Sequence, residues 1–282
     1  MGTQYTTIRI DRRDHVAEVV LNTPDRLNAM TTKFFHEVKA AFEELDADPV
    51  VRAVILWAEG RMFTCGLDLK EAATGVLGAA AGAGAGNGSK RSVAAQNFSL
   101  YRTIKSFQDC FSAIQRCRKP VIAAVHNKCI GGGVDLVTAC DIRLASADAS
   151  FAIYETKIAI VADVGTLQRI TPIVGKGLAR EMAFTGRFID SKRALAFGLV
   201  NDVVADKDAA LAAARAMAAE IAANSPIAVQ GAKAVLNYSD EHSTDEGLEY
   251  VAQWNSSFIQ SNDVAEALTA FLEKRPPEFT GD

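Results

Sequence analysis

Short apolar runs of strand length, separated by helix-like segments, limit most severely the folds open to this chain. Residues 50–57 and 121–125 are such runs, and residues 142–145 and 149–153 are two further strand candidates. A nearly continuous apolar run of this length is typical of a strand that is buried on both faces of a sheet. Between the first strands, Thr31 can N-cap a helix that reaches about Asp46, with one apolar face.

The order of these elements predicts the fold class. Residues 6–10 and 16–21 alternate like strands, and the chain is mostly helical from Thr166 onward. Units of two strands and a helix, followed by helices, predict an α/β core with a helical C-terminal part. With 282 residues, we expect a core over residues 1–205 and a helical C-terminal region over 206–282.

A Gly/Ala tract at residues 75–90 interrupts this pattern. Such a tract cannot adopt one conformation cheaply, so we expect a mobile loop over about 72–97, followed by a long helix over 98–116. The glycines do not have the spacing of a dinucleotide-binding or phosphate-binding loop, and no strand directly precedes them.

Composition and charge exclude several classes of function. The formal net charge is -4, which argues against nucleic acid as a partner, and no apolar stretch approaches the ~20 residues that cross a bilayer. The five cysteines form no CxxC pair, and with the polar N-terminus they indicate a reducing, cytoplasmic location. The four histidines are scattered, so we expect no metal site.

Two glycine-containing segments can present bare backbone amides. Gly131, Gly132 and Gly133 stand between a buried strand and a helix, and Gly66 lies in a loop after the strand that ends near Trp57. Amides at a helix N-terminus are already oriented to stabilise a developing oxyanion. A tight strand-to-helix turn would also explain the three glycines.

Three carboxylates follow the three glycines 131–133 in the chain. Asp135 lies in the first turn of the expected helix. Glu155 ends the later strand candidate that begins at residue 149, and Asp163 stands in an apolar stretch. A charge among apolar residues is costly unless it is paired or used. Neighbouring carboxylates in a dry pocket raise one another's pKa, which suits proton transfer near neutral pH. Asp163 could instead cap the next helix.

Together these motifs resemble the crotonase (enoyl-CoA hydratase/isomerase) superfamily over about residues 8–280. The specific segments are 26–30, 63–69, 128–143 and 271–275. The resemblance implies a spiral of ββα units with a helical C-terminal trimerisation region, in a homotrimer or homohexamer. It also implies an acyl-CoA thioester as substrate, with the N–H groups of Cys65 and Gly132 as the oxyanion hole for the thioester carbonyl.

The carboxylate pattern is similar to the dienoyl-CoA isomerases of that superfamily. Typical hydratases have two glutamates and a glycine eight positions after the second; here these positions are Asp135, Glu155 and Asp163. Moving a 3,5-diene to a 2,4-diene removes a proton at C2 and adds one at C6, several ångströms away. The resemblance therefore implies Asp163 as the base at C2, Glu155 as the acid at C6 and Asp135 as the group that tunes them. No cofactor is expected, since CoA belongs to the substrate.

Substrate contacts are expected around the same segments. Arg26, Lys70 and Lys274 are candidates for the CoA phosphates, with Lys274 reaching a neighbouring subunit, although each can equally be a solvated surface charge. Residues 100–111 can line the acyl tunnel or simply pack in the core. The remaining expected contacts are Leu27, Phe63, Gly66, Leu67, Asp68, Leu69 and Gly131.

Two other functions compete with the isomerase. An enoyl-CoA hydratase would use Asp135 and Glu155 to activate water and would have no evident task for Asp163. A catalytically silent acyl-CoA-binding protein would have no reason to retain three carboxylates in such apolar surroundings. The acid at position 163 thus separates the isomerase from both alternatives.

Overall fold

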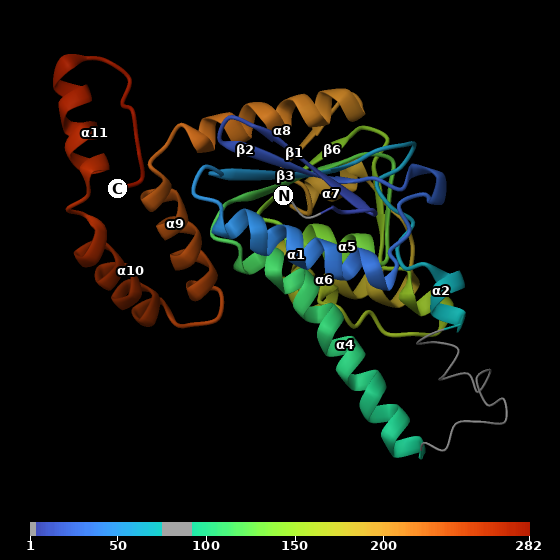
Figure 1. The fold of residues 1–282 in the computed structure, drawn as a ribbon. Coiled ribbons are helices and arrows are strands. Elements are labelled where there is room, and N and C mark those ends of the chain that lie inside the picture. Colours follow the sequence, from blue (N-terminus) through green and yellow to red (C-terminus); the bar gives the residue numbers. More distant parts are fainter. Residues whose placement is uncertain (1–3, 75–91) are drawn as a thin grey trace.

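The computed structural model describes residues 4–74 and 92–282. Helices cover both faces of a six-stranded sheet (Figure 1), so the predicted α/β class is confirmed. β1 pairs antiparallel with β2, and every later neighbour in the sheet is parallel. In spatial order the strands are β1 (Ile8–Arg13), β2 (Val16–Leu21), β3 (Ala53–Ala58), β4 (Val121–Val125), β6 (Ile142–Ser146) and β9 (Asp202–Val204).

A second, three-stranded sheet brings distant segments together. It consists of β5 (Lys128–Ile130), β7 (Ser150–Ala152) and β8 (Ile189–Asp190). β5 and β7 are parallel, with Ile130 opposite Ala152. Because parallel strands end at the same edge of a sheet, the chain after β5 and the chain after β7 emerge side by side. This edge carries Gly131 on one strand and leads to Glu155 on the other.

The central strands are buried on both faces, as their apolar sequences predict. Val54 and Leu56 of β3 pack into one core with helices α1 (Thr32–Ala47), α4 (Val93–Arg116), α5 (Gly132–Thr138) and α6 (Thr166–Thr185), whereas Ile55 and Trp57 face α8 (Lys207–Ala222). Successive side chains of a strand point to opposite faces, so an uninterrupted apolar run supplies two cores at once. Figure 1 shows α8 on one side of the sheet and α1, α5 and α6 on the other.

Helices α1 (Thr32–Ala47) and α4 (Val93–Arg116) lie against each other beside the sheet. The Thr31 side chain accepts a hydrogen bond from the amide of Phe34 and so caps α1, as expected. The expected start of the long helix at residue 98 is wrong, because Ser92 caps α4 one residue before Val93. Residues 72–74 are also helical, in α2 (Leu69–Thr74), so the loop predicted over 72–97 is shorter; its remainder, 75–91, lies outside the described residues.

Five further helices complete the core around the candidate site. Their bounds are Pro24–Arg26 for η1, Gly132–Thr138 for α5, Glu155–Ile158 for η2, Thr166–Thr185 for α6 and Ser191–Ala196 for α7. α5 begins at Gly132, directly after Gly131, whose φ of +52° turns the chain out of β5 and into the helix. Glu155 does not end a strand as predicted; it opens η2.

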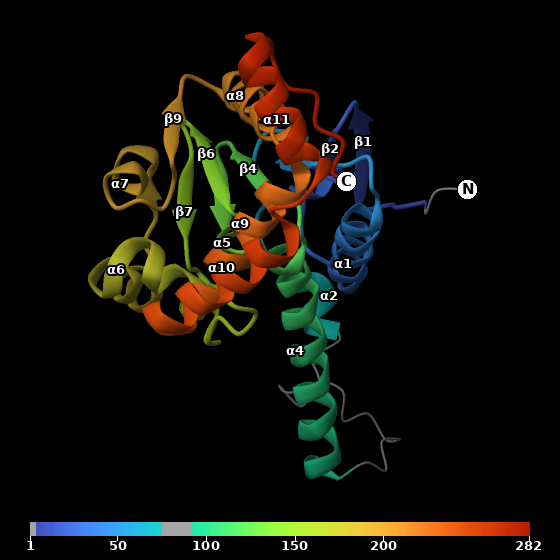
Figure 2. The same cartoon turned by 90° about the vertical axis from the view of Figure 1, so that its left-hand side faces the viewer.

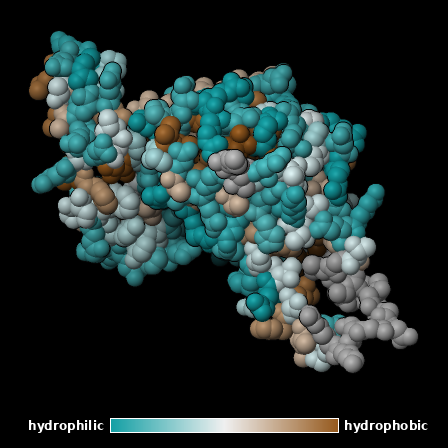
Figure 3. Space-filling model, in the orientation of Figure 1, coloured by the Kyte–Doolittle hydropathy of each residue, from teal (hydrophilic) through white to brown (hydrophobic). Residues whose placement is uncertain are grey.

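The C-terminal helices stand apart from the core in Figure 1, and in Figure 2 they lie in front of it, toward the viewer. They are α9 (Pro226–Ser239), α10 (Thr244–Phe258) and α11 (Asn262–Glu273). The region from 206 is mainly helical, but α8 packs on the large sheet and belongs to the core by its contacts. Phe271 and Leu272 of α11 are 82% and 79% exposed. Figure 3 shows hydrophobic residues at the surface of this part. No helix among the described residues is long and apolar enough to span a bilayer.

Candidate active site

Two backbone segments meet where β5 ends. Thr64 runs beside β5, with its amide 3.1 Å from the carbonyl oxygen of Lys128 and its own carbonyl accepting from Ile130. Gly66 follows with a φ of +84°, and a Cβ at this position would lie 2.7 Å from the carbonyl oxygen of Ile130 and 3.6 Å from the amide of Gly132. Only glycine combines this positive φ with so close an approach. The sequence therefore brings the loop of residues 63–69 against the first amide of α5.

The structure corrects one of the two expected oxyanion donors. The amide of Cys65 already donates to the carbonyl of Leu27 at 3.0 Å, so it is not free to bind a substrate. Leu67 forms a parallel bridge with Met30, in which the amides of Met30 and Asp68 make the hydrogen bonds. The amides of Leu67 and Gly132 make no hydrogen bond within the described parts of the chain. Both residues line the same cavity, so the described parts of the chain offer it unpaired amides at Leu67 and Gly132, rather than at Cys65 and Gly132.

The cavity between these segments has a volume of about 330 Å³ and is largely apolar. α4 forms one wall with Thr103, Ile104 and Phe107, and the ring of Phe107 stacks on Phe35 with centroids 4.3 Å apart. Within the expected stretch 100–111, these three residues are the cavity-lining ones. The other lining residues are Met30, Thr32, Phe35, Cys65, Gly66, Leu67, Asp68, Leu69, Glu71, Ala72, Ile130, Gly131, Gly132, Tyr154, Glu155, Ile158, Ile160, Asp163 and Val164.

Glu155 enters the cavity from η2. A Cβ on Gly131 would lie 3.0 Å from Glu155 Oε1, so the carboxyl group sits directly against the glycine turn. Its Oε2 is buried and has no hydrogen-bond partner among the described residues. Burial, and next the charge of Asp135, raise the pKa of Glu155 to about 7. At neutral pH this group can therefore hold a proton and give it away.

Asp135 lies behind the cavity rather than in its wall. Its side chain is 0% exposed, and Oδ1 accepts a hydrogen bond from the amide of Thr166 at 2.6 Å. Burial raises the pKa of Asp135 to about 6, opposed by the hydrogen bonds from Thr166. Asp135 thus acts on Glu155 through its charge, and it does not line the space that a substrate would fill.

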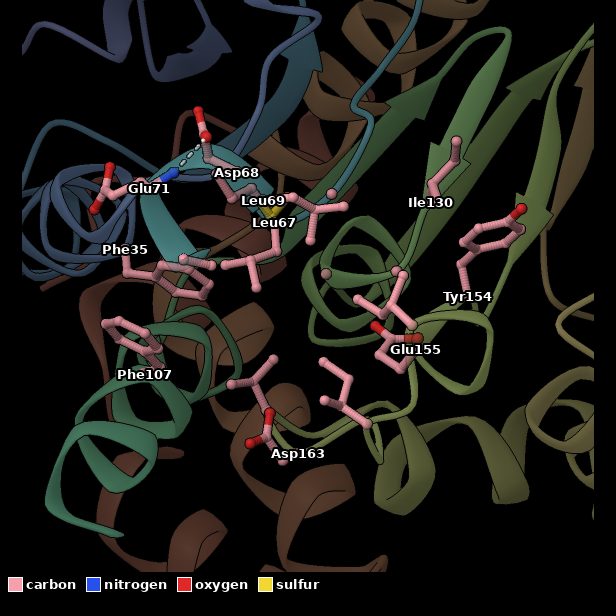
Figure 4. Close-up of a pocket in the computed structure, with 18 of the residues that line it drawn as sticks. Phe35, Leu67, Asp68, Leu69, Glu71, Phe107, Ile130, Tyr154, Glu155 and Asp163 are labelled. Atoms are coloured by element: carbon pink, nitrogen blue, oxygen red, sulfur yellow. Dashed lines mark hydrogen bonds between the residues drawn. The ribbon is translucent and has the colours of Figure 1, made fainter. Parts of the chain in front are cut away.

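Asp163 lies on the loop between η2 and α6. Its carboxylate does not cap α6, because the N-cap is Gly165, which makes no side-chain cap. The carbonyl of Asp163 accepts from the Gln108 side chain at 2.7 Å, which ties the loop to α4. The side chain is solvent accessible, yet the surrounding protein still raises its pKa by desolvation. Figure 4 shows Asp163 at the bottom of the pocket, Phe107 to the left, and Glu155 to the right, below Tyr154.

Comparison with known proteins agrees with this geometry. The sequence model of the enoyl-CoA hydratase/isomerase family matches residues 11–282. A mitochondrial Δ(3,5)-Δ(2,4)-dienoyl-CoA isomerase of Dictyostelium discoideum is 45% identical over 98% of this chain and 92% of its own length. A peroxisomal enzyme of the same name from Arabidopsis thaliana is 43% identical over 98% and 97%.

The chain belongs to the enoyl-CoA hydratase/isomerase family.

The solved structures extend this family likeness to the fold. The crystal structure of enoyl-CoA hydratase from Bacillus anthracis aligns with a TM-score of 0.86 at 30% identity, covering 98% of this chain and all of the other. The spiral α/β fold implied by the sequence is thereby confirmed as that of the family.

Several expected substrate contacts of this family member lie away from the cavity wall. Arg26 is paired with Asp68, which lines the cavity, and Lys70 is exposed on α2. Phe63 is fully buried, and Leu27 supplies the carbonyl that binds the Cys65 amide. Lys274 ends α11, far from α2 in Figure 1. Sequence reasoning missed Tyr154, Ile158 and Ile160 as lining residues; their position next to Glu155 was the available signal.

The raised pKa of Glu155 predicts a stability that falls with pH. In the unfolded chain its pKa is near 4.5, and in the folded protein it is about 7. Between these values the unfolded state releases a proton that the native state keeps, so rising pH favours unfolding. We expect Glu155→Gln to raise the free energy of unfolding by about 1–2 kcal/mol at pH 8, after a discount for partial solvent screening.

Denaturant unfolding of both proteins at pH 5 and pH 8 measures this difference. At pH 5 the variant and the parent should differ by less than at pH 8, because Glu155 is still protonated in the native state. An equal difference at the two pH values would mean that the glutamate titrates normally.

Proposed function

We propose that this protein isomerises 3,5-dienoyl-CoA to 2,4-dienoyl-CoA in fatty acid β-oxidation. The observation that carries the proposal is a pair of acids, Glu155 and Asp163, that line the same apolar cavity as Leu67 and Gly132, whose amides make no hydrogen bond in the described parts of the chain. A shift of two double bonds needs a proton removed at one end and added at the other, and the pair offers one group for each end. The dienoyl-CoA isomerases that the chain resembles support the same reaction.

The proposed reaction begins at C2. The carboxylate of Asp163 takes the C2 proton, and the electron pair moves into the thioester carbonyl, whose oxygen accepts hydrogen bonds from Leu67 and Gly132. Preorganised amides of this kind stabilise the dienolate without reorganising, which makes the α-proton removable. Protonated Glu155 then gives its proton to C6 as the electrons return through the diene. Solvent exchange resets both acids, so no cofactor enters the proposed cycle.

The assignment of base and acid follows from the two environments. Asp163 is solvent accessible, whereas burial and the charge of Asp135 raise the pKa of Glu155 to about 7. Environments that differ in this way separate the group that is ionised from the group that is protonated at neutral pH. Asp163 therefore suits the base and Glu155 the acid.

A hydratase is less well supported. Its water would have to lie between two carboxylates, but Asp135 does not line the cavity and gives Oδ1 to the amide of Thr166. Only Glu155 of that pair reaches the space in which water would meet a substrate. A silent acyl-CoA-binding protein is also disfavoured, because Glu155 and Asp135 carry their raised pKa values at a cost to the folded state.

Direct observation of the product tests the proposed activity. We expect the purified protein to convert a 3,5-dienoyl-CoA thioester into the conjugated 2,4-dienoyl product, followed by ultraviolet absorbance. A 2-trans-enoyl-CoA of the same chain length serves as the comparison substrate. Rapid hydration of that thioester, with no diene conjugation, would replace the isomerase by the hydratase.

Assembly is a further part of the proposal. We propose a homotrimer, or a homohexamer of paired trimers, in which α10 and α11 bury their exposed apolar side chains against neighbouring copies. Leu248, Leu268 and Phe271 on these helices are among the most exposed large apolar residues of the described chain. Exposed apolar patches of this kind mark association surfaces. The molar mass in solution distinguishes the monomer, trimer and hexamer.

The contacts with CoA and the location in the cell complete the proposal. Arg26 pairs with the cavity-lining Asp68, and exposed Lys70 follows the cavity-lining Leu69 in the chain, so both can approach phosphates; in an oligomer Lys274 can come from a neighbouring copy. We propose a cytoplasmic location because all five cysteines are free thiols in the structure. The two relatives described above carry the names mitochondrial and peroxisomal, so cell fractionation decides this point.

A further inference from the structure

Arg169 lies on α6 behind the three carboxylates and is held from two elements. Its Nε donates to Gln115 Oε1 at 3.0 Å and its Nη2 to Ser112 Oγ at 2.9 Å, both on α4. Its Nη1 lies 3.4 Å from the carbonyl oxygen of Val164, which directly follows Asp163. The guanidinium thus links α4 to the loop that carries the proposed base.

The same loop is built around the guanidinium. Gly165 has a φ of +127°, and a Cβ at this position would lie 1.8 Å from Arg169 Nη1. No other residue could pass so close to the cation without displacing it. Because Gly165 is also the N-cap of α6, the position of Arg169 sets how the chain passes from Asp163 into the helix.

None of the described groups that accept a hydrogen bond from Arg169 carries a negative charge. Gln115, Ser112 and the Val164 carbonyl are neutral, and no ion pair in the described parts of the chain includes Arg169. A partly buried cation without an ion-pair partner is costly, so its field must act on another group. The first charge that acts on it is Asp135, which is fully buried and whose Oδ2 has no hydrogen-bond partner in the described structure.

Several other groups act on the same pair. Asp163 on the loop before α6 and Glu155 on η2 interact with Asp135, and Cys129 on β5 faces it as a buried thiol. Arg116 on α4 and Cys140 after α5 act on Arg169. Among these groups, Arg169 is the cation that acts directly on Asp135. The amide of Thr166 at the N-terminus of α6 also donates to Asp135 Oδ1 and so stabilises the same carboxylate.

We propose that Arg169 is a positioning residue, whose guanidinium holds the Asp163 loop against α4 and keeps the carboxylate of Asp135 charged. This rests on the proposed function, because it assigns a task to Arg169 in the same proton transfer. Charged Asp135 in turn raises the pKa of Glu155, so that Glu155 retains the proton it must donate. Arg169 acts through these acids and does not line the cavity.

The pH dependence of kcat separates this role from a merely structural one. Activity should fall at high pH as Glu155 loses its proton, with a midpoint near its pKa of about 7. In Arg169→Met, Asp135 loses its cation, becomes protonated and no longer repels a charge on Glu155. The fall of kcat at high pH, called the high-pH limb of the profile, should therefore move to lower pH by about 0.5–1 unit. A shift of this size is within the range that one nearby charge produces.

Matched variants separate charge from anchoring. Arg169→Lys keeps a cation, so its high-pH limb should stay near that of the parent, although kcat falls because the contacts with Gln115 and Ser112 are lost. Gln115→Met keeps the guanidinium and removes the anchor of Nε, so kcat should fall about 3–10-fold with the limb unmoved, as for one lost hydrogen bond. An unmoved limb in a folded Arg169→Met protein would overturn the proposal.

Asp135→Asn tests the same coupling if Arg169→Met does not fold. Asn is isosteric and can still accept from the Thr166 amide, but it is neutral at every pH. Its high-pH limb should lie below that of the parent, and adding Arg169→Met should move it no further. Carbon-13 NMR titration of the Glu155 carboxyl gives the same comparison without any substrate. A titration shift without dienoyl-CoA turnover by the parent would reject the proposed function alone, and turnover with an unshifted Glu155 would reject the role of Arg169.

Discussion

Asp163→Asn should reduce the kcat for diene isomerisation by about 10²–10⁴-fold, the contribution typical of a positioned general base. The amide has the shape of the carboxylate but cannot accept the C2 proton. The carboxylate caps no helix, so its replacement removes no hydrogen bond on which the start of α6 depends. The loss should therefore appear in turnover, while the fold and the affinity for CoA change little.

Three measurements on this variant separate chemistry from binding. Stopped-flow absorbance follows conjugation of the diene, calorimetry measures the affinity for an acyl-CoA product, and thermal unfolding reports stability. Asp208→Asn, the same substitution on an exposed residue in the first turn of α8, is the matched control and should retain parental activity. If Asp163→Asn isomerises the diene at a rate within tenfold of the parent, Asp163 is not the base that removes the C2 proton.

The sequence allowed the fold class and the two cavity acids to be predicted, for identifiable physical reasons. Apolar runs such as 121–125 can satisfy their burial only between two helical layers, so they determined the strands of the sheet. Glu155 and Asp163 were conspicuous because carboxylates rarely stand in such apolar stretches without a use. Both line the cavity.

The choice of oxyanion amide could not be predicted from composition or motif. Cys65 and Leu67 stand two residues apart and would face the same side of a regular strand, but Gly66 between them has a φ of +84° and turns the chain, so their amides point in different directions. Here the bridge between Leu67 and Met30 and the bond from Cys65 to Leu27 settle that direction. These pairings join segments that are far apart in the sequence. For this reason no local pattern in residues 63–69 predicts them.

Arg169 escaped prediction for a related reason. An arginine on a helix is usually a solvated charge, and nothing in its neighbours along the chain suggests otherwise. Its contacts come from α4, more than fifty residues earlier. The reason for the glycine at 165 is likewise visible only in the structure, where a Cβ at this position would occupy the place of the guanidinium.

The second large effect is expected for Gly66→Ala, which should lower kcat by about 10²–10³-fold, as removal of one oxyanion donor does. The added Cβ would lie 2.7 Å from the carbonyl oxygen of Ile130, so the two segments must move apart. A φ of +84° also strains any side chain. Because Leu67 follows directly, its amide would turn away from that of Gly132, and the dienolate oxygen would lose a donor.

Gly177→Ala is the matched control for this substitution. Gly177 lies within α6, has no positive φ, and a Cβ there would meet no atom within 4 Å. Alanine in a helix interior is favoured over glycine, so this variant should be as stable as the parent or slightly more stable, with full activity. Steady-state kinetics should show the loss for Gly66→Ala in kcat more than in KM, because the oxyanion contact strengthens as charge develops on the carbonyl. A Gly66→Ala protein that folds and turns over like Gly177→Ala would mean that the amides of Leu67 and Gly132 do not hold the reacting oxygen.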